Sequence, residues 1–140
     1  MLSKTSIHAI KAMVALAKIP DNSYAGAAKI AEQVNAPKNY LGKLLQTLAR
    51  ERLVFSQKGL GGGFCLARDP DEITLYHVVT PIEQVDRWKE CILGQRECND
   101  QCACSLHCKW EAVRNSYLSL LQETTIADLV TQHGSWPMLE

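Results

Sequence analysis

Apolar side chains recur about every three to four residues in the first third of the chain, which is the period of an amphipathic α-helix. Three such helices are predicted, over residues 4–18, 26–34 and about 37–51. Away from the apolar stripe, the first helix carries Lys4, Lys11 and Lys18. We therefore expect each helix to bury a single stripe, and these three lysines to lie outside the core.

The second and third helices are separated by only two residues, Asn35 and Ala36. Pro37 suits the first position of the next helix, because the N–H that proline lacks would have no partner there. Two short helices across a tight turn predict a helix-turn-helix, with a plain helical hairpin as the alternative. On the outward face of the third helix, the side chains that can reach phosphates and base edges are Lys38, Asn39, Tyr40, Lys43, Gln46 and Thr47.

Two short strands are predicted directly after these helices, over residues 53–57 and 64–67. They are joined by Lys58-Gly59-Leu60-Gly61-Gly62-Gly63, a basic tip whose glycines let the backbone approach another surface closely. A helix-turn-helix followed by such a hairpin has the layout of a winged helix. We expect Lys58, Gly61 and Gly62 to meet the DNA. A phosphate-binding P-loop is disfavoured, because Phe64 opens a strand and no Lys-Ser/Thr pair follows the glycines.

Helical periodicity returns in the second half of the chain. Thr74 is predicted to cap a helix that ends near Pro81, and Thr125 a last short helix. Between them, residues 109–123 form the longest helical pattern, whose apolar stripe is Trp110, Val113, Tyr117, Leu120 and Leu121. This stripe would pack on the first helix or on its own copy in a second subunit.

The predicted fold class is mainly α with a small β-wing, a winged helix-turn-helix with a long C-terminal dimerisation helix. We divide the chain into a winged helix (1–84), a cysteine-rich cluster-binding loop (85–108), and a dimerisation helix with its tail (109–140). At 140 residues the chain is long enough to bury a core of its own.

Charge divides the chain, although its net charge is zero. Residues 1–60 hold nine Lys/Arg and three Asp/Glu, a balance of +6, whereas residues 61–140 hold six and twelve, a balance of −6. A basic first half suits contact with phosphates. No apolar run approaches the roughly 18 residues of a membrane helix, and the N-terminus lacks a signal-peptide layout. We therefore expect a cytoplasmic protein in a reducing compartment, with no membrane partner.

Five of the six cysteines lie close together: Cys91, Cys98, Cys102, Cys104 and Cys108. Thiolates are soft ligands that suit iron–sulfur clusters and zinc. Zinc ribbons usually carry Cys-x2-Cys pairs, whereas the wider spacing of Cys91, Cys98 and Cys104 lets a loop wrap a larger cluster. The spacing favours an iron–sulfur cluster over thiol-only redox sensing and over structural zinc. The sixth cysteine, Cys65, falls on a wing strand and is interpreted as a small core residue.

The order of these motifs resembles the Rrf-two family of bacterial winged-helix transcriptional regulators over almost the whole chain. The resemblance rests on His8–Met13, Lys29–Glu32, Pro37–Leu41, Lys58–Phe64, Ile73–Leu75, the three cysteines Cys91, Cys98 and Cys104, Ser105–Trp110, and Thr125–Val130. Each segment alone is unspecific, but their order and spacing together are specific. The resemblance implies a homodimer that binds a palindromic operator in double-stranded DNA. It also implies an iron–sulfur cluster, held by three cysteines, whose state changes DNA affinity.

Carried over to this sequence, the resemblance assigns Cys91, Cys98 and Cys104 as cluster ligands. His107, three residues after Cys104, is the candidate for the fourth ligand, and a capping or packing role at the helix start is the alternative. Other family members take a ligand from the partner's first helix, often an acid, but Thr5-Ser6-Ile7-His8 offers no carboxylate. This favours a 2Fe–2S cluster with His107 over a 4Fe–4S cluster. Cys102 and Cys108 are extra to the family pattern.

Two departures from the family concern DNA recognition. Gly42 stands where a well-studied member has an acidic residue used in operator discrimination, and Lys58 replaces the usual arginine of the wing, which disfavours bidentate readout there. The predicted function is that of a DNA-binding transcriptional regulator, not an enzyme. Its operator affinity would follow an iron–sulfur cluster that senses redox state, nitric oxide, or iron and cluster supply. A cluster-free thiol regulator and a cysteine-based oxidoreductase are the alternatives.

Overall fold

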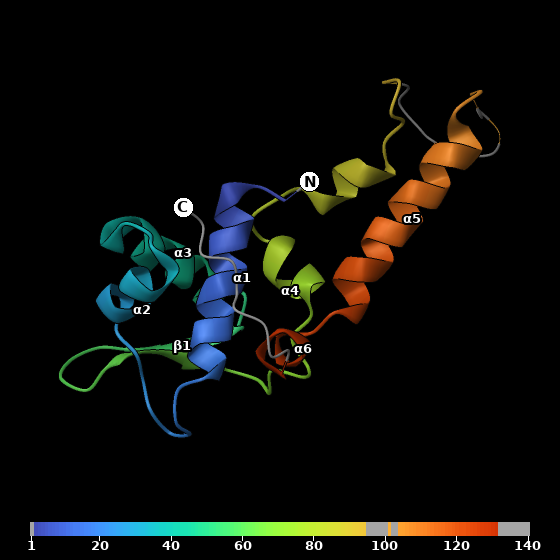
Figure 1. The fold of residues 1–140 in the computed structure, drawn as a ribbon. Coiled ribbons are helices and arrows are strands. Elements are labelled where there is room, and N and C mark those ends of the chain that lie inside the picture. Colours follow the sequence, from blue (N-terminus) through green and yellow to red (C-terminus); the bar gives the residue numbers. More distant parts are fainter. Residues whose placement is uncertain (1, 95–100, 102–103, 132–140) are drawn as a thin grey trace.

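The computed structural model describes residues 2–94, 101 and 104–131. In chain order its elements are helices α1 (Lys4–Ala17), α2 (Ala27–Val34) and α3 (Lys38–Arg50), strands β1 (Val54–Gln57) and β2 (Gly63–Leu66), helix α4 (Leu75–Val79), the 3-10 helix η1 (Val85–Lys89), and helices α5 (His107–Glu123) and α6 (Ile126–Thr131). The predicted class, mainly α with a small β-wing, is confirmed. Figure 1 shows two parts: a head built from α1–α4, the wing β1–β2 and α6, and an arm, formed by η1 and α5, that projects from it.

Helix α1 runs through the centre of the head. Ser3 caps it, because its Oγ accepts a hydrogen bond from the Ser6 N–H at 3.1 Å. Helices α2, α3, α4 and α6 and strand β2 all pack on α1, and nine of its fourteen residues are buried. The expectation that Lys11 lies outside the core is therefore wrong: the residue is 9% exposed, and burial lowers the pKa of its amine. A helix surrounded by neighbours has no wholly solvated face.

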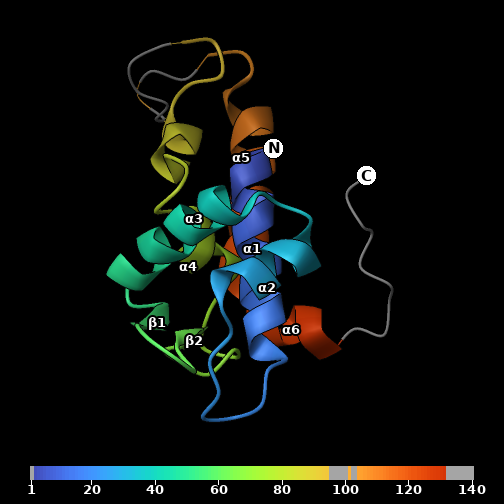
Figure 2. The same ribbon diagram turned by 90° about the vertical axis from the view of Figure 1, so that its left-hand side faces the viewer.

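Helices α2 and α3 form the predicted helix-turn-helix. After α2 the chain turns at Asn35, whose backbone is left-handed with φ 54° and ψ 53°. Pro37 lies one position before the predicted one: it is the N-cap of α3, and its carbonyl accepts the Leu41 N–H at 2.9 Å. The predicted stripe of α3 is buried, namely Leu41, Leu44, Leu45 and Leu48. Figure 2 shows α2 and α3 in front of α1, with the wing beneath them.

The wing is a two-stranded antiparallel hairpin, paired from Val54 with Leu66 to Gln57 with Gly63. Gly63 has φ 137°, and a Cβ there would collide with the carbonyl of Ala25, so the position requires glycine. This close approach lets Ala25 and Phe64 exchange two backbone hydrogen bonds, at 2.9 and 2.8 Å. The wing is thereby fixed to the segment just before α2.

The arm leaves the head after α4 and returns to it through α6. Thr74 caps α4 as predicted, and His77 completes the cap because its Nδ1 accepts the Thr74 N–H at 3.1 Å. The periodicity did not predict η1, and α5 begins at His107 rather than at the predicted position 109. Helix α5 packs on α4, whereas α6, capped by Thr125 as predicted, packs on α1. In the described ranges, no helix is long and apolar enough to cross a membrane.

Candidate DNA interface and cluster site

The N-terminal half of α3 presents most of the predicted DNA-contact side chains to solvent. Lys38, Asn39 and Lys43 are exposed. Lys38 and Asn39 also lie in the first turn of the helix, where backbone N–H groups and the helix dipole favour an approaching phosphate. Thr47 is less available, because its hydroxyl donates to the Lys43 carbonyl at 3.2 Å and accepts from Arg50 at 3.3 Å.

Tyr40 differs from its neighbours, because it is half-buried and contacts α1. Its hydroxyl lies 3.2 Å from Nδ1 of His8, and the two rings meet edge to face with centroids 5.5 Å apart. Burial lowers the pKa of His8, and the positive charges of Lys4 and Lys11 lower it further. A neutral imidazole therefore holds Tyr40 in place at neutral pH. This contact links the N-terminal end of α1 to the helix that carries the DNA-contact residues, and nothing in the sequence indicated it.

The wing tip presents a small, basic and partly apolar surface. Lys58 is exposed, and Gly61 adopts φ 74°, which favours glycine. At Gly62 a Cβ would collide with the carbonyl of Gln57, so the hairpin closes tightly there. Leu60 extends fully into solvent between these glycines. The sequence analysis gave Leu60 no role, although an apolar residue among exposed glycines could have been noticed.

Two of the predicted cluster ligands lie in the described residues on the two sides of the cysteine-rich segment. Cys91 is buried, and its Sγ accepts a hydrogen bond from the Leu93 N–H at 3.4 Å. Cys104 is half-buried, and its carbonyl accepts the His107 N–H at 3.0 Å. Cys108 is exposed in the first turn of α5. Cys98 and Cys102 lie outside the described residues.

His107, the candidate fourth ligand, is the first residue of α5 and is buried. Its Nε2 lies 3.9 Å from the Glu111 carboxylate, which is in turn 3.7 Å from the Arg114 guanidinium. Both separations exceed hydrogen-bonding distance. Burial at the helix start also agrees with the alternative role of His107 in packing.

The residues present are chemically suited to an iron–sulfur cluster. Thiolate sulfurs and an imidazole nitrogen are the donors that such clusters take, and an N–H bonded to a cysteine sulfur, as at Cys91, is a feature that tunes them. Within ranges 2–94 and 104–131, no three cysteine, histidine or acidic side chains come together as metal ligands. The ligand set therefore stays a prediction that depends on Cys98.

An aromatic stack joins η1 to α5 beside the cysteine-rich segment. The ring of Trp88 lies between Trp110, at 5.7 Å, and Tyr117, at 4.2 Å, and both pairs are stacked. Trp110 Nε1–H also donates to the Glu90 carbonyl at 3.0 Å. This fixes the chain immediately before Cys91 against the helix that begins at His107. The stack could not be found by periodicity, because η1 is not an amphipathic α-helix.

One edge of the apolar stripe of α5 is exposed to solvent. Leu106 precedes the helix, and Val113 and Leu120 follow it at intervals of seven residues; the last two are 58% and 56% exposed. An apolar residue in every seventh position is the pattern of a helix that packs along another helix. Of the predicted stripe, Leu121 is buried and Trp110 and Tyr117 are half-buried against the arm itself. The stripe thus has one covered edge and one exposed edge, and we call the exposed edge the outer face of α5.

A winged helix-turn-helix with an exposed basic α3 defines the protein as a DNA-binding transcriptional regulator. A family model described as "Rrf2: Iron-dependent Transcriptional regulator" matches residues 2–132, and the chain belongs to this family, as the sequence resemblance predicted. A protein of Synechocystis sp. with the name of an HTH-type transcriptional regulator is 32% identical over 96% of this chain and 90% of its own. The transcriptional regulator IscR of Sodalis glossinidius is 28% identical over 93% of this chain and 78% of its own. These relatives are regulators and not enzymes.

Solved structures share the same fold. CymR, titled the global cysteine regulator of B. subtilis, has a TM-score of 0.79 at 24% identity, covering 94% of this chain and 96% of that one. IscR of T. potens has a TM-score of 0.76 at 24% identity, covering 100% and 93%. The fold of head and arm is therefore shared with these proteins. The fold alone does not determine what the arm binds, which depends on its own residues.

Proposed function

We propose that this protein is a homodimeric regulator whose affinity for a palindromic operator is controlled by an iron–sulfur cluster. Cys91, Cys98 and Cys104 would hold the cluster and His107 would complete it, with the 2Fe–2S type favoured. The observation that carries the proposal is the pairing of a buried Cys91, whose sulfur accepts an N–H, with a buried His107 across one cysteine-rich segment. When bound, the cluster supplies an iron centre that is sensitive to oxidation, nitric oxide and iron supply.

The residues around this segment explain how its state would reach the DNA. The stack of Trp88 with Trp110 and Tyr117 holds the two sides of the segment together, and α5 packs on α4, which packs on α1. Ordering or releasing the segment would therefore change the angle of α5 relative to the head. In a dimer joined through α5, that angle sets the spacing of the two α3 helices. Half-sites are recognised only at the matching spacing.

DNA recognition would use the exposed residues of α3 and the wing. Lys38, Asn39 and Lys43 would enter the major groove or contact its phosphates, and Tyr40, held by His8, would lie beside them. The wing would place Lys58, Gly61 and Gly62 along the backbone, with Lys58 acting as a single positive charge. Duplex affinity measured by fluorescence anisotropy should fall steeply with salt, and Lys38→Gln or Lys43→Gln should each reduce that slope by about one.

The decisive experiment is anaerobic purification with a visible spectrum and counts of iron and acid-labile sulfide. We expect a coloured protein with equal iron and sulfide. Cys91→Ala, Cys98→Ala and Cys104→Ala should each lose both, whereas Cys108→Ala and Cys65→Ala should keep them. His107→Ala should weaken the cluster, and His107→Cys should restore it with an altered spectrum. A colourless wild-type protein, or three cysteine variants that keep their iron, would refute the cluster.

A cluster-free thiol regulator is the second candidate, and one observation supports it. Cys108 is an exposed thiol in the first turn of α5, four residues after the half-buried Cys104. A structural neighbour is titled as the oxidized form of CymR from Staphylococcus aureus, with a TM-score of 0.77 at 22% identity. If the purified protein is colourless and peroxide changes its DNA affinity, loss of that response in Cys108→Ser would establish this second function.

A further inference from the structure

Leu60 lies in the turn at the tip of the wing. Its exposed fraction of 107% is the highest among the exposed large apolar side chains of the described residues. The Gly62 N–H donates to the Gly59 carbonyl at 3.1 Å, so Leu60 and Gly61 form the corner of a closed β-turn. Gly61 has φ 74°, a value that glycine adopts without strain. The turn therefore carries the leucine side chain outward, where its burial contributes nothing to the fold.

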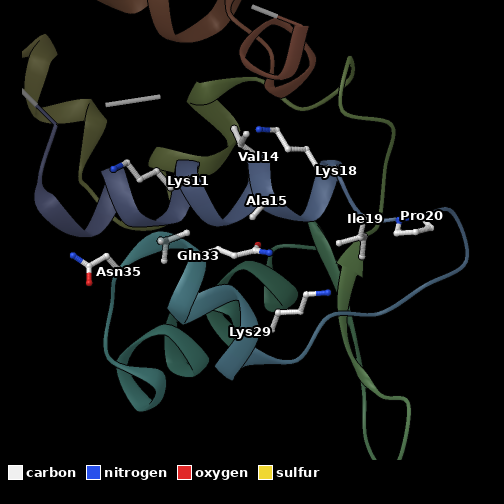
Figure 3. A pocket seen from close by; sticks show the side chains of 10 residues that line it. Lys11, Val14, Ala15, Lys18, Ile19, Pro20, Lys29, Gln33 and Asn35 are labelled. Carbon is white, nitrogen blue, oxygen red and sulfur yellow. The ribbon is translucent and has the colours of Figure 1, made fainter. Parts of the chain in front are cut away.

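The base of the wing is fixed to the head. Ala25 and Phe64 exchange two backbone hydrogen bonds just before α2, and Figure 3 shows the chain from Pro20 to α2 running past the strands of the wing. The Ala67 N–H donates to the Leu53 carbonyl at 3.0 Å, which closes the hairpin at its base, and strand β1 packs on α3. The tip is therefore carried at a defined position relative to α2 and α3.

The surroundings of Leu60 suit the minor groove of a DNA duplex. Gly59 and Gly61 carry no side chains, and a Cβ at either would meet nothing within 4 Å, so the leucine stands between two bare stretches of backbone. A tip this narrow suits a groove about 6 Å wide. Figures 1 and 2 place α3 and the wing on the same side of the head, the side away from the arm. Lys58, which is exposed, would contact a phosphate at the edge of the groove.

We propose that Leu60 is a wedge, which enters the minor groove beside the bases read by α3 and partly unstacks one base step. Leucine is among the apolar side chains that can unstack a base step in this way and kink the duplex. The role differs from that of Lys58, Gly61 and Gly62, which are assigned to the DNA backbone. The inference rests on the proposed DNA binding but not on the proposed cluster.

A protein partner fits Leu60 less well than DNA does. A stable protein interface buries about 800 Å² on each side, which a single leucine cannot supply. The other exposed large apolar side chain of the hairpin is that of Phe55, which pairs with Cys65 nearer the base of the wing. A wedge requires only one apolar side chain on a firmly held support, and this is what the wing presents.

The wedge would add sequence preference at a step that no polar side chain reads. Pyrimidine–purine steps such as TA and CA/TG unstack most easily, so a protein that opens one step favours sites that carry them. We therefore expect each half-site of the operator to hold such a step at a fixed distance from the bases that face α3.

The test uses an operator that the wild-type protein itself selects from a pool of random duplexes. 2-Aminopurine, an adenine analogue whose fluorescence rises when it is unstacked, replaces each adenine in turn. The wild-type protein should raise the signal at one step in each half-site. Leu60→Ala should remove this rise and weaken operator binding by at least about fivefold, whereas Leu60→Met should keep both. Phe55→Ala, on the same hairpin, is the control and should keep the rise. Thermal unfolding should be unchanged in Leu60→Ala, because the side chain is fully exposed.

A mismatched base pair at the same step gives a second measurement. The mismatch lowers the cost of opening, so the wild-type protein should bind this duplex at least about threefold more tightly than the matched one, whereas Leu60→Ala should bind both equally. Operator binding without an opened step, an unchanged Leu60→Ala, or equal loss of the signal in Phe55→Ala would overturn the wedge and leave the DNA-binding regulator standing. A wild-type protein that enriches and binds no duplex would instead refute the proposed function, and the wedge with it.

Discussion

Helix α1 at the centre of the head and helix α5 of the arm differ in how much of each is buried. In α1, nine of fourteen residues are buried, because five elements surround it. In α5, two of seventeen are buried, and its packing on the head is through α4. Most of the buried core therefore lies in the head, whereas the arm leaves an apolar face exposed, where the proposed dimer contact would form. The DNA-binding residues of α3 therefore lie on the well-packed part, and the proposed sensing site lies on the part with fewer buried residues.

The largest expected effect of a mutation lies in the core of the head. Leu45 of α3 is fully buried, so Leu45→Ala should lower the free energy of unfolding by about 2–5 kcal/mol. Leu93→Ala, at an exposed position beside the cysteine-rich segment, should cost less than about 0.5 kcal/mol. Urea unfolding followed by circular dichroism measures both. Equal costs would mean that head and arm do not differ in packing.

The next effect concerns association through the outer face of α5. Leu120→Glu places a charge on this exposed apolar face and should weaken the dimer by at least tenfold, about 1.4 kcal/mol, while leaving monomer stability unchanged. Gln122→Glu adds the same charge at another exposed position of the same helix and serves as its control. Sedimentation velocity over a concentration series gives the dimer dissociation constants. A Leu120→Glu protein that dimerises normally would place the interface elsewhere.

A smaller effect should appear in acid, at the contact between α1 and α3. The folded state lowers the pKa of His8 through burial and through Lys4 and Lys11, so it favours the neutral ring. The contribution to stability is present above the ordinary value of 6.5 and is lost as pH falls through the lowered pKa. Urea midpoints between pH 5 and 8 should fall less steeply in His8→Asn than in the wild type. An unchanged slope would assign the acid sensitivity to the other histidines.

The smallest effect is expected at Tyr117, in the aromatic stack of the arm. Among the described residues its hydroxyl is buried without a hydrogen-bond partner, while its ring stacks on Trp88. Tyr117→Phe keeps the stack and removes the unsatisfied group, so stability should change by less than about 1 kcal/mol and in the favourable direction.

Tyr117 also predicts how the stability of the protein changes at alkaline pH. Burial, and next the charge of Glu83, raise the pKa of Tyr117, so wild-type stability should be lost as pH rises above 10, the ordinary value. The Phe variant should lack this contribution. A clear loss of stability on Tyr117→Phe at neutral pH would mean that the hydroxyl has a partner in solution.

Local patterns predicted most of the fold, because the helices of the head have their own apolar stripes and three of them, α1, α4 and α6, have side-chain caps. Thr74 and Thr125 were identifiable as caps from residue type and position alone. Lys11 was misplaced, because the helical period shows which side is apolar but not how many neighbours will cover the other sides. The contact of His8 with Tyr40 spans 32 residues and has no sequence signature.

For the candidate cluster site, the sequence indicated which residues could bind iron, but not which side chains hold the cysteine-rich segment in place. The cysteines and His107 were proposed from residue type, spacing and the family resemblance, whereas the stack of Trp88 on Trp110 and Tyr117 required the fold. The 3-10 helix that carries Trp88 is only five residues long, too short for a period to be recognised. Which edge of the α5 stripe is covered and which is exposed likewise depends on how the arm packs.

The two ends of the arm meet at the head. The Leu75 N–H donates to the Thr124 carbonyl at 2.9 Å, and the Ile126 N–H donates to the Ile73 carbonyl at 2.8 Å. The arm, which leaves the head after α4 and returns to it before α6, therefore starts and ends close to one place on the head. Such an excursion can be lengthened, shortened or given a different ligand set without disturbing the path of the remaining chain. One DNA-binding head can in this way take different arms during evolution, and an engineer could exchange the arm between the end of α4 and the start of α6.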